Sequence, residues 1–269
     1  FVVFNMKIKE VLILTRPHQW YKNILIFLGL IFSRNIFNFP LVNLAFQGFI
    51  VLILVSSANY ILNDIIDIPN DKINPEKRKR PLASGKIKTP FAAFLLLFLL
   101  TVGLVWAYLL NNLFFFTLLG IFIISCLYSL FLKKILFVDI IAISFNFVLR
   151  AIAGAVIINV FISPWLVTGI FFFALFLTTG KRYGELEYLN EKSSEHRKVL
   201  KYYTKPLLAS LFNIFAGLII IIFAIFSFSS EHKYLIWAIP FFVYLILRYY
   251  FLIISNSEIA RRPEQAITD

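Results

Sequence analysis

Charged side chains are scarce in this 269-residue chain, because Asp, Glu, Lys and Arg together make up only 15% of it. A water-soluble domain usually carries about 25%. Hydrophobic residues make up 60%, Phe alone occurs 32 times, and the mean hydropathy is +0.85. This composition excludes an ordinary soluble domain. It indicates that lipid is the solvent for much of the protein surface.

Cysteine and acidic residues are also few. The one cysteine, Cys126, lies in an apolar run, which excludes a disulfide framework and a site of several thiolates. Lys and Arg number 26 against 14 Asp and Glu, a net charge of +12. We expect no nucleic-acid partner, because 22 of the 26 basic residues lie in alternate polar segments. The positive-inside rule then places the N-terminus and the large loops in the cytoplasm, with the chain in a bacterial inner membrane.

Eight apolar runs are long enough to cross a bilayer as helices, since a spanning helix needs about 20 residues. The runs are continuous rather than alternating, which argues against a β-barrel. The sequence therefore predicts an all-α, polytopic transmembrane bundle that forms a single domain over residues 1–269. The predicted spans are residues 14–33, 41–62, 91–110, 113–132, 136–158, 164–179, 206–228 and 234–254.

Three carboxylates follow the second predicted span at a helical spacing. Asp64, Asp67 and Asp71 are three and four residues apart, which places them on one face of a helix. Like charges so placed repel unless a cation lies among them, and hard oxygen ligands suit Mg²⁺. A solvated acidic loop is the alternative interpretation. Pro69 predicts a kink before Asp71, and the basic cluster Lys77–Arg80 follows, so the segment is suited to a metal-bound pyrophosphate.

The stretch Asn63–Ile87, NDIIDIPNDKINPEKRKRPLASGKI, resembles the first aspartate-rich motif of the UbiA superfamily, NDxxDxxxD followed by RPLxSG. The family also begins with a sequence like Arg16-Pro17-His18-Gln19-Trp20-x-Lys22-Asn23. The resemblance covers essentially the whole chain. It implies an all-helical bundle around a central cavity, capped by loops 63–90 and 180–205, with Mg²⁺ and a diphosphate bound by the first motif. Since the family usually has nine spans, we expect a ninth beyond Asp269.

Two departures from the aromatic-ring prenyltransferases of this superfamily indicate a branch. The second aspartate-rich motif is absent, and Thr179–Glu187 stands in its place. Tyr128 and Lys133 are five residues apart instead of four. Together with Asp139 and Leu149–Gly154, these features resemble the branch that transfers phosphoribose to decaprenyl phosphate, a precursor step of arabinan in cell walls. The resemblance implies phosphoribosyl pyrophosphate as donor and a membrane polyprenyl phosphate as acceptor.

Candidate site residues follow from this reading. Lys181 and Arg182 would hold the extra phosphate charge of these substrates, although anchoring at lipid headgroups is the alternative for either. Glu185 would ligate metal or contact ribose hydroxyls. Arg150, a charge within a span, would bind substrate or else pair with Asp139 or Glu185. The predicted catalytic residues are Asp64, Asp67, Asp71 and Lys181, of which the three aspartates would also bind the metal. The predicted substrate-binding residues are Lys22, Asn63, Lys77, Arg78, Arg80, Tyr128, Lys133, Lys134, Asp139, Arg150, Arg182 and Glu185.

The sequence thus predicts a Mg²⁺-dependent membrane transferase that moves 5-phosphoribose to a polyprenyl phosphate and releases pyrophosphate. A prenyltransferase that moves a polyprenyl group onto an aromatic acceptor is the first alternative. A transporter or a noncatalytic scaffold is the second, and the crowding of ionisable residues at one face, away from the midplane, argues against it. The oligomeric state is open, with a homo-oligomer among the expectations.

Overall fold

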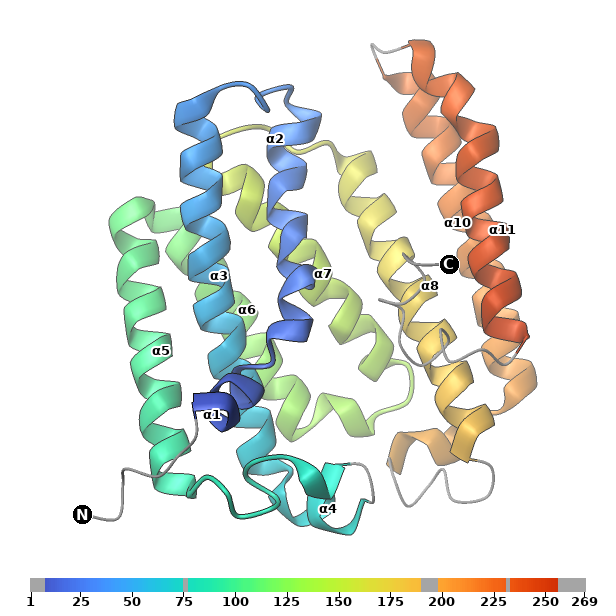
Figure 1. The fold of residues 1–269 in the computed structure, drawn as a ribbon. Coiled ribbons are helices and arrows are strands. Elements are labelled where there is room, and N and C mark those ends of the chain that lie inside the picture. The colour runs from blue at the N-terminus through green and yellow to red at the C-terminus, as the bar shows by residue number, and fades with distance from the viewer. Residues whose placement is uncertain (1–7, 75–76, 190–197, 231–232, 256–269) are drawn as a thin grey trace. The chain divides into compact units, whose positions relative to one another are not determined.

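The computed structural model describes residues 8–74, 77–189, 198–230 and 233–255. Over these residues the regular structure is α-helix and 3-10 helix (Figure 1). Within these described residues, seven helices are long and apolar enough to cross a membrane. They confirm the all-α class. The seven are Phe39–Ile66, Thr89–Leu110, Asn112–Leu130, Val138–Ile157, Pro164–Glu187, Lys205–Ser229 and Tyr234–Ile254.

The chain divides into two compact units, which are described separately. Unit 1 comprises Phe1–Phe131 and Leu149–Ile162, and unit 2 comprises Leu132–Val148 and Ser163–Asp269. The helix α7 (Val138–Ile157) contributes its first half to unit 2 and its second half to unit 1.

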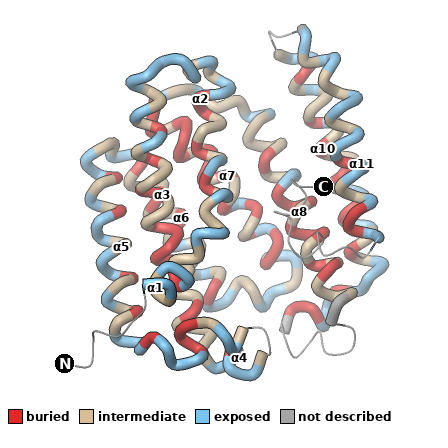
Figure 2. The backbone as a smooth tube through the Cα atoms, in the orientation of Figure 1, coloured by how far each residue is buried: buried red, intermediate tan, exposed pale blue. Residues whose placement is uncertain are grey.

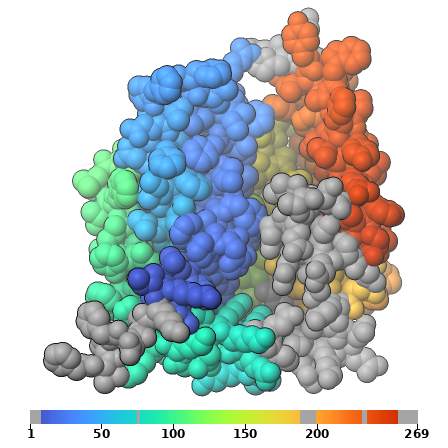
Figure 3. Space-filling view, viewed as in Figure 1, coloured from blue at the N-terminus to red at the C-terminus, as the bar shows by residue number. Residues whose placement is uncertain are grey.

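The helix α3 (Phe39–Ile66) is the centre of unit 1. Every residue from Val55 to Asn59 is buried, so protein surrounds this part of the helix on all sides. The helices α5 (Thr89–Leu110) and α6 (Asn112–Leu130) pack beside α3, and α5 keeps large apolar side chains exposed along its length (Figure 2). In the space-filling view, the N-terminal helices and α3 form a continuous surface of side chains (Figure 3). The exposed apolar face of α5 is suited to lipid tails.

The predicted span 14–33 is wrong as a single α-helix. The segment is divided into α1 (Ile8–Thr15), the 3-10 helix η1 (Pro17–Phe27) and α2 (Leu28–Phe32). The break falls at Arg16, whose φ of 52° lies in the left-handed region. Pro17 has no backbone N–H to continue α1, and its ring disfavours the helical conformation in the residue before it. The predicted count of eight spans is therefore not confirmed.

The 3-10 helix η1 lies close against the second half of α7, within unit 1. A Cβ atom on Gly154 would lie 1.8 Å from the carbonyl oxygen of Ile26, and one on Gly29 would lie 3.0 Å from the backbone nitrogen of Ala155. Only glycine allows two backbones to come this near. This contact sets the distance between η1 and α7, and with it the position of Asn23 on η1.

Unit 2 is built on three helices joined by an aromatic stack. The Phe212 ring from α10 (Lys205–Ser229) lies 4.3 Å from the Phe176 ring of α8 (Pro164–Leu189), measured between centroids. It lies 5.0 Å from the Tyr250 ring of α11 (Ile239–Ile254), which follows the 3-10 helix η6 (Lys233–Ala238). Stacked rings of this kind contribute about 0.5–1.5 kcal/mol per pair beyond the area they bury.

The end predicted for the sixth span, residue 179, is too early, because α8 continues to Leu189. Gly180 does not interrupt the helix, and Lys181, Arg182 and Glu185 lie on it. A hydropathy boundary stops at the first charges, whereas here Arg182 pairs with Glu185 of the same helix and with Asp139. The expected ninth span and the tail 256–269 lie outside the described residues.

Candidate active site

The aspartate-rich motif lies where α3 ends. Asn63 and Asp64 belong to its last turn, Asp67 ends the helix, and α4 (Ile68–Ile73) begins at the next residue with Pro69 at its start. The interruption predicted from Pro69 is thus present, and it costs little because a first-turn proline needs no N–H. Asp71 is in α4, and its backbone N–H donates to the Asp67 carbonyl oxygen at 2.8 Å.

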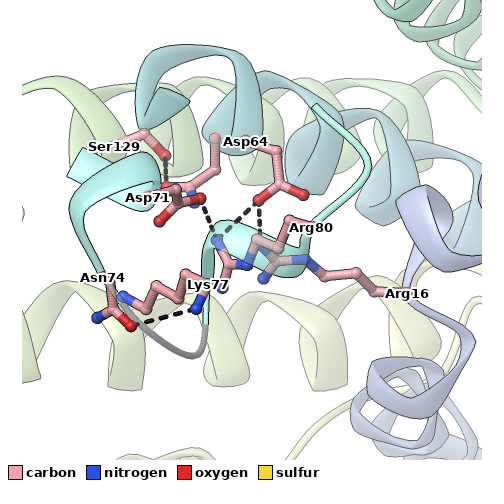
Figure 4. A network of polar contacts seen from close by, with 8 residues as sticks. Arg16, Asp64, Asp71, Asn74, Lys77, Arg80 and Ser129 are labelled. Atoms are coloured by element: carbon pink, nitrogen blue, oxygen red, sulfur yellow. Dashed lines mark hydrogen bonds and ion pairs between the residues drawn. The ribbon is translucent and has the colours of Figure 1, made fainter. Parts of the chain in front are cut away.

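Two arginines from distant parts of the chain pair with these carboxylates. Arg16 donates from Nη2 to Asp64 Oδ1. Arg80 donates from Nη1 to Asp64 Oδ1 at 3.0 Å and to Asp71 Oδ2 at 2.7 Å (Figure 4). Asp64 and Asp71 are each only 3% exposed. Buried carboxylates need such partners, because an isolated buried charge is strongly destabilising.

Neutral side chains hold the surrounding backbone in place. The Asn63 side-chain oxygen accepts a hydrogen bond of 3.1 Å from the Ser129 hydroxyl of α6, which ties the end of α3 to its neighbour (Figure 4). The Asn74 side-chain oxygen accepts from the Lys77 backbone N–H at 3.1 Å, at the start of the 3-10 helix η2 (Lys77–Lys79). The loop that carries Arg80 is therefore anchored on the same side as the carboxylates.

Burial sets the electrostatics of Asp71. Loss of contact with water raises the pKa of its carboxyl group, and the Arg80 guanidinium opposes that rise. A further cation at this point would lower the pKa of Asp71 and favour the ionised carboxylate.

The predicted metal triad is not preformed. Among the residues that the structure describes, no three His, Cys, Asp or Glu side chains gather closely enough to hold a metal ion. Asp64 and Asp71 nonetheless suit a hard divalent cation, because their oxygens already converge on one cationic nitrogen of Arg80. Asp67 is half-buried at the turn between α3 and α4.

A second polar cluster of unit 1 surrounds Arg150, which is 7% exposed. Its Nε donates to the Asn23 side-chain oxygen at 3.1 Å, and that oxygen also accepts from the Ser56 hydroxyl at 3.2 Å. The alternative partners considered for Arg150, Asp139 and Glu185, form ion pairs with Arg182. The hydrogen bond from Arg150 to the Asn23 amide was not predicted from the sequence.

Unit 2 holds a buried ionic network around Arg182, which is 1% exposed. Arg182 donates to Asp139 Oδ2 at 2.8 Å and to Glu185 Oε2 at 2.9 Å. The Tyr203 hydroxyl donates to Asp139 Oδ1 at 2.7 Å and accepts from the Phe137 backbone N–H at 3.2 Å. Burial, followed by the hydrogen bond to Asp139, raises the pKa of Tyr203, so the phenol keeps its proton.

Residues 23–263 match the sequence pattern described as the UbiA prenyltransferase family. The chain belongs to the UbiA prenyltransferase family. It is therefore a multi-pass integral membrane protein and a transferase, in agreement with its seven long apolar helices. The resemblance inferred from the aspartate-rich motif is thus confirmed at the level of the family.

Two similar UbiA-family proteins are decaprenyl-phosphate phosphoribosyltransferases. The protein of Mycolicibacterium smegmatis is 29% identical, over 93% of this chain and 83% of its own length. That of Corynebacterium glutamicum is 30% identical, over 87% of this chain and 74% of its own. A UbiA homolog from Archaeoglobus fulgidus, solved bound to DMAPP and Mg²⁺, aligns with a TM-score of 0.75 at 20% identity, over 91% of this chain and 87% of that one. The last comparison confirms the UbiA-type helical fold.

The remaining candidate residues of this UbiA chain differ in exposure. Those that are half-buried are Lys22, Lys77, Tyr128, Lys133 and Lys181, and those that are exposed are Arg78 and Lys134. Lys22 lies on η1, with its ammonium 5.9 Å from the Tyr21 ring centroid. Lys133 and Lys134 form the 3-10 helix η3 (Leu132–Lys134). Their roles stay predictions.

Besides Asn23, Arg16 and Tyr203 are polar partners that sequence reasoning missed. Arg16 stood within the quoted N-terminal motif, but its partner Asp64 is 48 residues away. Tyr203 is 64 residues from Asp139, beside the 3-10 helix η5 (Lys198–Tyr202). Neither pairing follows from spacing. Arg16 is a charged residue in an apolar stretch, directly before Pro17. That position is the signal that could have marked Arg16 as a site residue.

Proposed function

We propose that this UbiA-family transferase moves 5-phosphoribose from phosphoribosyl pyrophosphate to a membrane polyprenyl phosphate and releases pyrophosphate. The observation that carries the proposal is the cluster in unit 1, where two buried aspartates and two arginines meet. Carboxylates for a divalent cation, next to guanidinium groups for phosphate oxygens, are the two parts that a metal-bound diphosphate needs. The similar mycobacterial and corynebacterial proteins support ribose phosphate as the group transferred.

Asp64 and Asp71 would hold Mg²⁺, with Asp67 as a third oxygen donor. When bound there, Mg²⁺ would supply positive charge to the pyrophosphate as it leaves. Arg80, Arg78 and Lys77 would hold the diphosphate oxygens. The guanidinium groups bind phosphate in a fixed, bidentate geometry, and the lysine ammonium acts as a point charge.

The proposed reaction is a substitution at the anomeric carbon of ribose. The bond from C1 to the pyrophosphate oxygen breaks, and a bond forms from C1 to an oxygen of the lipid phosphate, which attacks the opposite face. The electron pair of the broken bond leaves with pyrophosphate. A phosphate monoester is already ionised near neutral pH, so the chain needs no strong general base. Positioning and charge stabilisation are the contributions asked of the protein.

The residues of unit 2 divide into two groups in this proposal. Lys181, Lys133 and Lys134 are offered as ligands of substrate phosphate groups, and Tyr128 of unit 1 is offered separately for the same role. Arg182 already pairs with Asp139 and Glu185, so its geometry favours a positioning role for the helix α8. Glu185 keeps a partly exposed carboxylate, which suits a ribose hydroxyl or a metal.

The orientation is part of the proposal. Phosphoribosyl pyrophosphate is a soluble donor, and the basic segments that carry Lys77–Arg80 and Lys181 belong to the side that the positive-inside rule assigns to the cytoplasm. We propose a bacterial inner membrane, with the site open to the cytoplasm.

The test is a comparison of two reactions on one purified preparation. The wild-type protein is incubated with Mg²⁺, labelled phosphoribosyl pyrophosphate and polyprenyl phosphate, and separately with a prenyl diphosphate and 4-hydroxybenzoate. We expect a labelled lipid only in the first reaction, and its loss in Asp64→Asn. Formation of a prenylated aromatic product, with no ribosylated lipid, would establish the alternative prenyltransferase reaction instead.

A further inference from the structure

One guanidinium nitrogen bridges two buried carboxylates in unit 1. Arg80 Nη1 lies 3.0 Å from Asp64 Oδ1 and 2.7 Å from Asp71 Oδ2 (Figure 4). Arg16 adds a second guanidinium on Asp64 Oδ1 and lies over the Tyr60 ring, 5.4 Å from its centroid. A single positive centre between two carboxylates is the arrangement that a bound divalent cation also makes.

The paired charges of this cluster are equal in number. Asp64 and Asp71 carry two negative charges, and Arg16 and Arg80 carry two positive ones. Arginine does not lose its proton in proteins, so loss of a proton from Arg16 or Arg80 cannot release these pairs. While they stay ionised, the two buried carboxylates can exchange their guanidinium partners only for another cation. A divalent ion leaves the balance of the two aspartates unchanged.

The arginines are the more exposed members of the cluster. The aspartate side chains are 4% exposed and lie on α3 and α4, whereas the side chains of Arg80 and Arg16 are 27% and 18% exposed. A long, partly exposed side chain can turn towards water at little cost, but a buried carboxylate on a helix cannot. An exchange of partners would thus move the arginines and leave Asp64 and Asp71 in place.

We infer that Arg80, assisted by Arg16, bridges Asp64 and Asp71 before the metal-bound diphosphate enters, and then moves to the phosphate oxygens. The inference rests on the metal and diphosphate part of the proposed function and is independent of the group transferred. It gives both arginines two successive partners. Asp64 and Asp71 are first bridged by the guanidinium of Arg80, and the positive charges of Arg80 and Arg16 are then available to the pyrophosphate.

The inference predicts effects of opposite sign for two ligands. In Arg80→Gln, Mg²⁺ alone no longer competes with a guanidinium, so its apparent affinity should rise about tenfold, the equivalent of one charged hydrogen bond. Mg²⁺ with inorganic pyrophosphate should bind about tenfold more weakly, because the contact from Arg80 to phosphate is lost. If Arg80 only stabilised the fold, its replacement would change neither affinity. If Arg80 only bound phosphate, its replacement would weaken the binding of Mg²⁺ with pyrophosphate and leave the affinity for Mg²⁺ alone unchanged.

Thermal unfolding of the full chain in detergent micelles measures both effects. The melting temperature is followed against Mg²⁺ alone, and against pyrophosphate at fixed Mg²⁺. Without metal, Arg80→Gln should melt below wild type, because two buried carboxylates have lost a shared partner. The matched control is Lys86→Gln, which removes one positive charge from the same loop, where Lys86 is an exposed partner of Glu10 at 3.4 Å. The control should bind both ligands like wild type.

Equal responses to Mg²⁺ in wild type and Arg80→Gln would overturn the inference, as would weaker binding of both ligands by the variant. If Arg80→Gln does not fold, Arg16→Gln is measured in its place and should show the same two signs with smaller size, since Arg16 pairs with Asp64 alone. The proposed phosphoribosyl transfer is judged separately by its lipid product. A chain that transferred a prenyl group would refute that function and leave the exchange of arginines intact.

Discussion

At the residue scale, the charge of Asp64 is the property on which the proposed site depends. Asp64→Asn keeps the size of the side chain and removes the charge that pairs with Arg16 and Arg80. We expect turnover to fall at least about 100-fold, the usual effect of losing one preorganised group that stabilises charge. The melting temperature should change by only a few degrees, because both arginine side chains are partly exposed and can turn to water. Product formation and thermal unfolding measure the two effects.

Glu10→Gln is the control for Asp64→Asn. Glu10 also pairs with a basic side chain, Lys86, but lies outside the aspartate-rich motif. It should keep near-wild-type turnover. Turnover in Asp64→Asn within a few-fold of wild type, at saturating Mg²⁺, would remove Asp64 from the site.

The buried network of unit 2 leads to a prediction about stability. Arg182→Gln leaves the fully buried Asp139 with only the Tyr203 hydroxyl, so we expect a loss of about 3–5 kcal/mol in the free energy of unfolding. Tyr203→Phe keeps the ion pair and should cost about 1–2 kcal/mol. Reversible unfolding in mixed micelles would rank the two variants.

Lys205→Gln supplies the comparison for that ranking. Lys205 pairs with Glu187 at 2.6 Å, but its side chain is 49% exposed, so the loss should stay below about 1 kcal/mol. A cost for Arg182→Gln no larger than that of Lys205→Gln would show that the buried network does not hold unit 2 together.

The same residues show how far the sequence could predict the site. The spacing of Asp64 and Asp71 predicted a shared face of one helix, but the two lie on successive helices, α3 and α4. They meet on Arg80 across the turn at Asp67, which a helical repeat does not predict. The partner Arg16 was not predictable, since its contact depends on a left-handed turn before Pro17 and on packing across 48 residues. Arg182 was read as a phosphate ligand. Its burial with Asp139 depends on tertiary contacts that no spacing reports.

At the element scale, the contact between η1 and α7 can be tested by one methyl group. Gly154→Ala would place a Cβ atom 1.8 Å from the Ile26 carbonyl oxygen, so η1 must shift away from α7. We expect a cost of about 1–3 kcal/mol in unfolding free energy, the usual penalty of overpacking. The shift should also weaken the hydrogen bond from Arg150 to Asn23.

Gly120→Ala in α6 is the matched substitution, because nothing lies within 4 Å of a Cβ atom there. It should be neutral or stabilise the protein by up to about 1 kcal/mol, since alanine is the better helix former. Both variants are compared by thermal unfolding. Equal melting temperatures would mean that η1 does not rest on Gly154 as described.

Hydropathy predicted the positions of the long apolar helices well, but it predicted poorly where helices with polar or charged residues begin and end. The predicted spans 91–110 and 206–228 lie within α5 and α10, because lipid contact requires continuous apolar sequence. The span 14–33 failed because a 3-10 helix of 11 residues has the same hydropathy as an α-helix. The end of α8 was misplaced because paired charges can continue a helix beyond the apolar run.

At the scale of the whole molecule, the distribution of basic residues makes a prediction about orientation that the fold alone does not contain. The helix α3 has 28 residues and is about 42 Å long at about 1.5 Å per residue, enough to cross a hydrocarbon core of about 30 Å. Asn38, directly before α3, and Lys86, beyond the aspartate-rich loop, are both exposed. The basic segment that includes Lys86 should face the cytoplasm, and Asn38 should face the opposite side.

Single-cysteine labelling can measure this orientation. The native Cys126 is first replaced by serine, and a cysteine is then introduced as Asn38→Cys or as Lys86→Cys. In intact cells a membrane-impermeant maleimide should label Asn38→Cys, whereas Lys86→Cys should react only after the membrane is opened. The physical reason is that moving the basic loop across the bilayer would require translocation of Lys77–Arg80 and their neighbours against the bias that retains positive charge inside. The reverse pattern of labelling would place Asp64 and its arginines on the outer face, away from a cytoplasmic phosphoribosyl donor, and the proposed reaction would then lose its substrate.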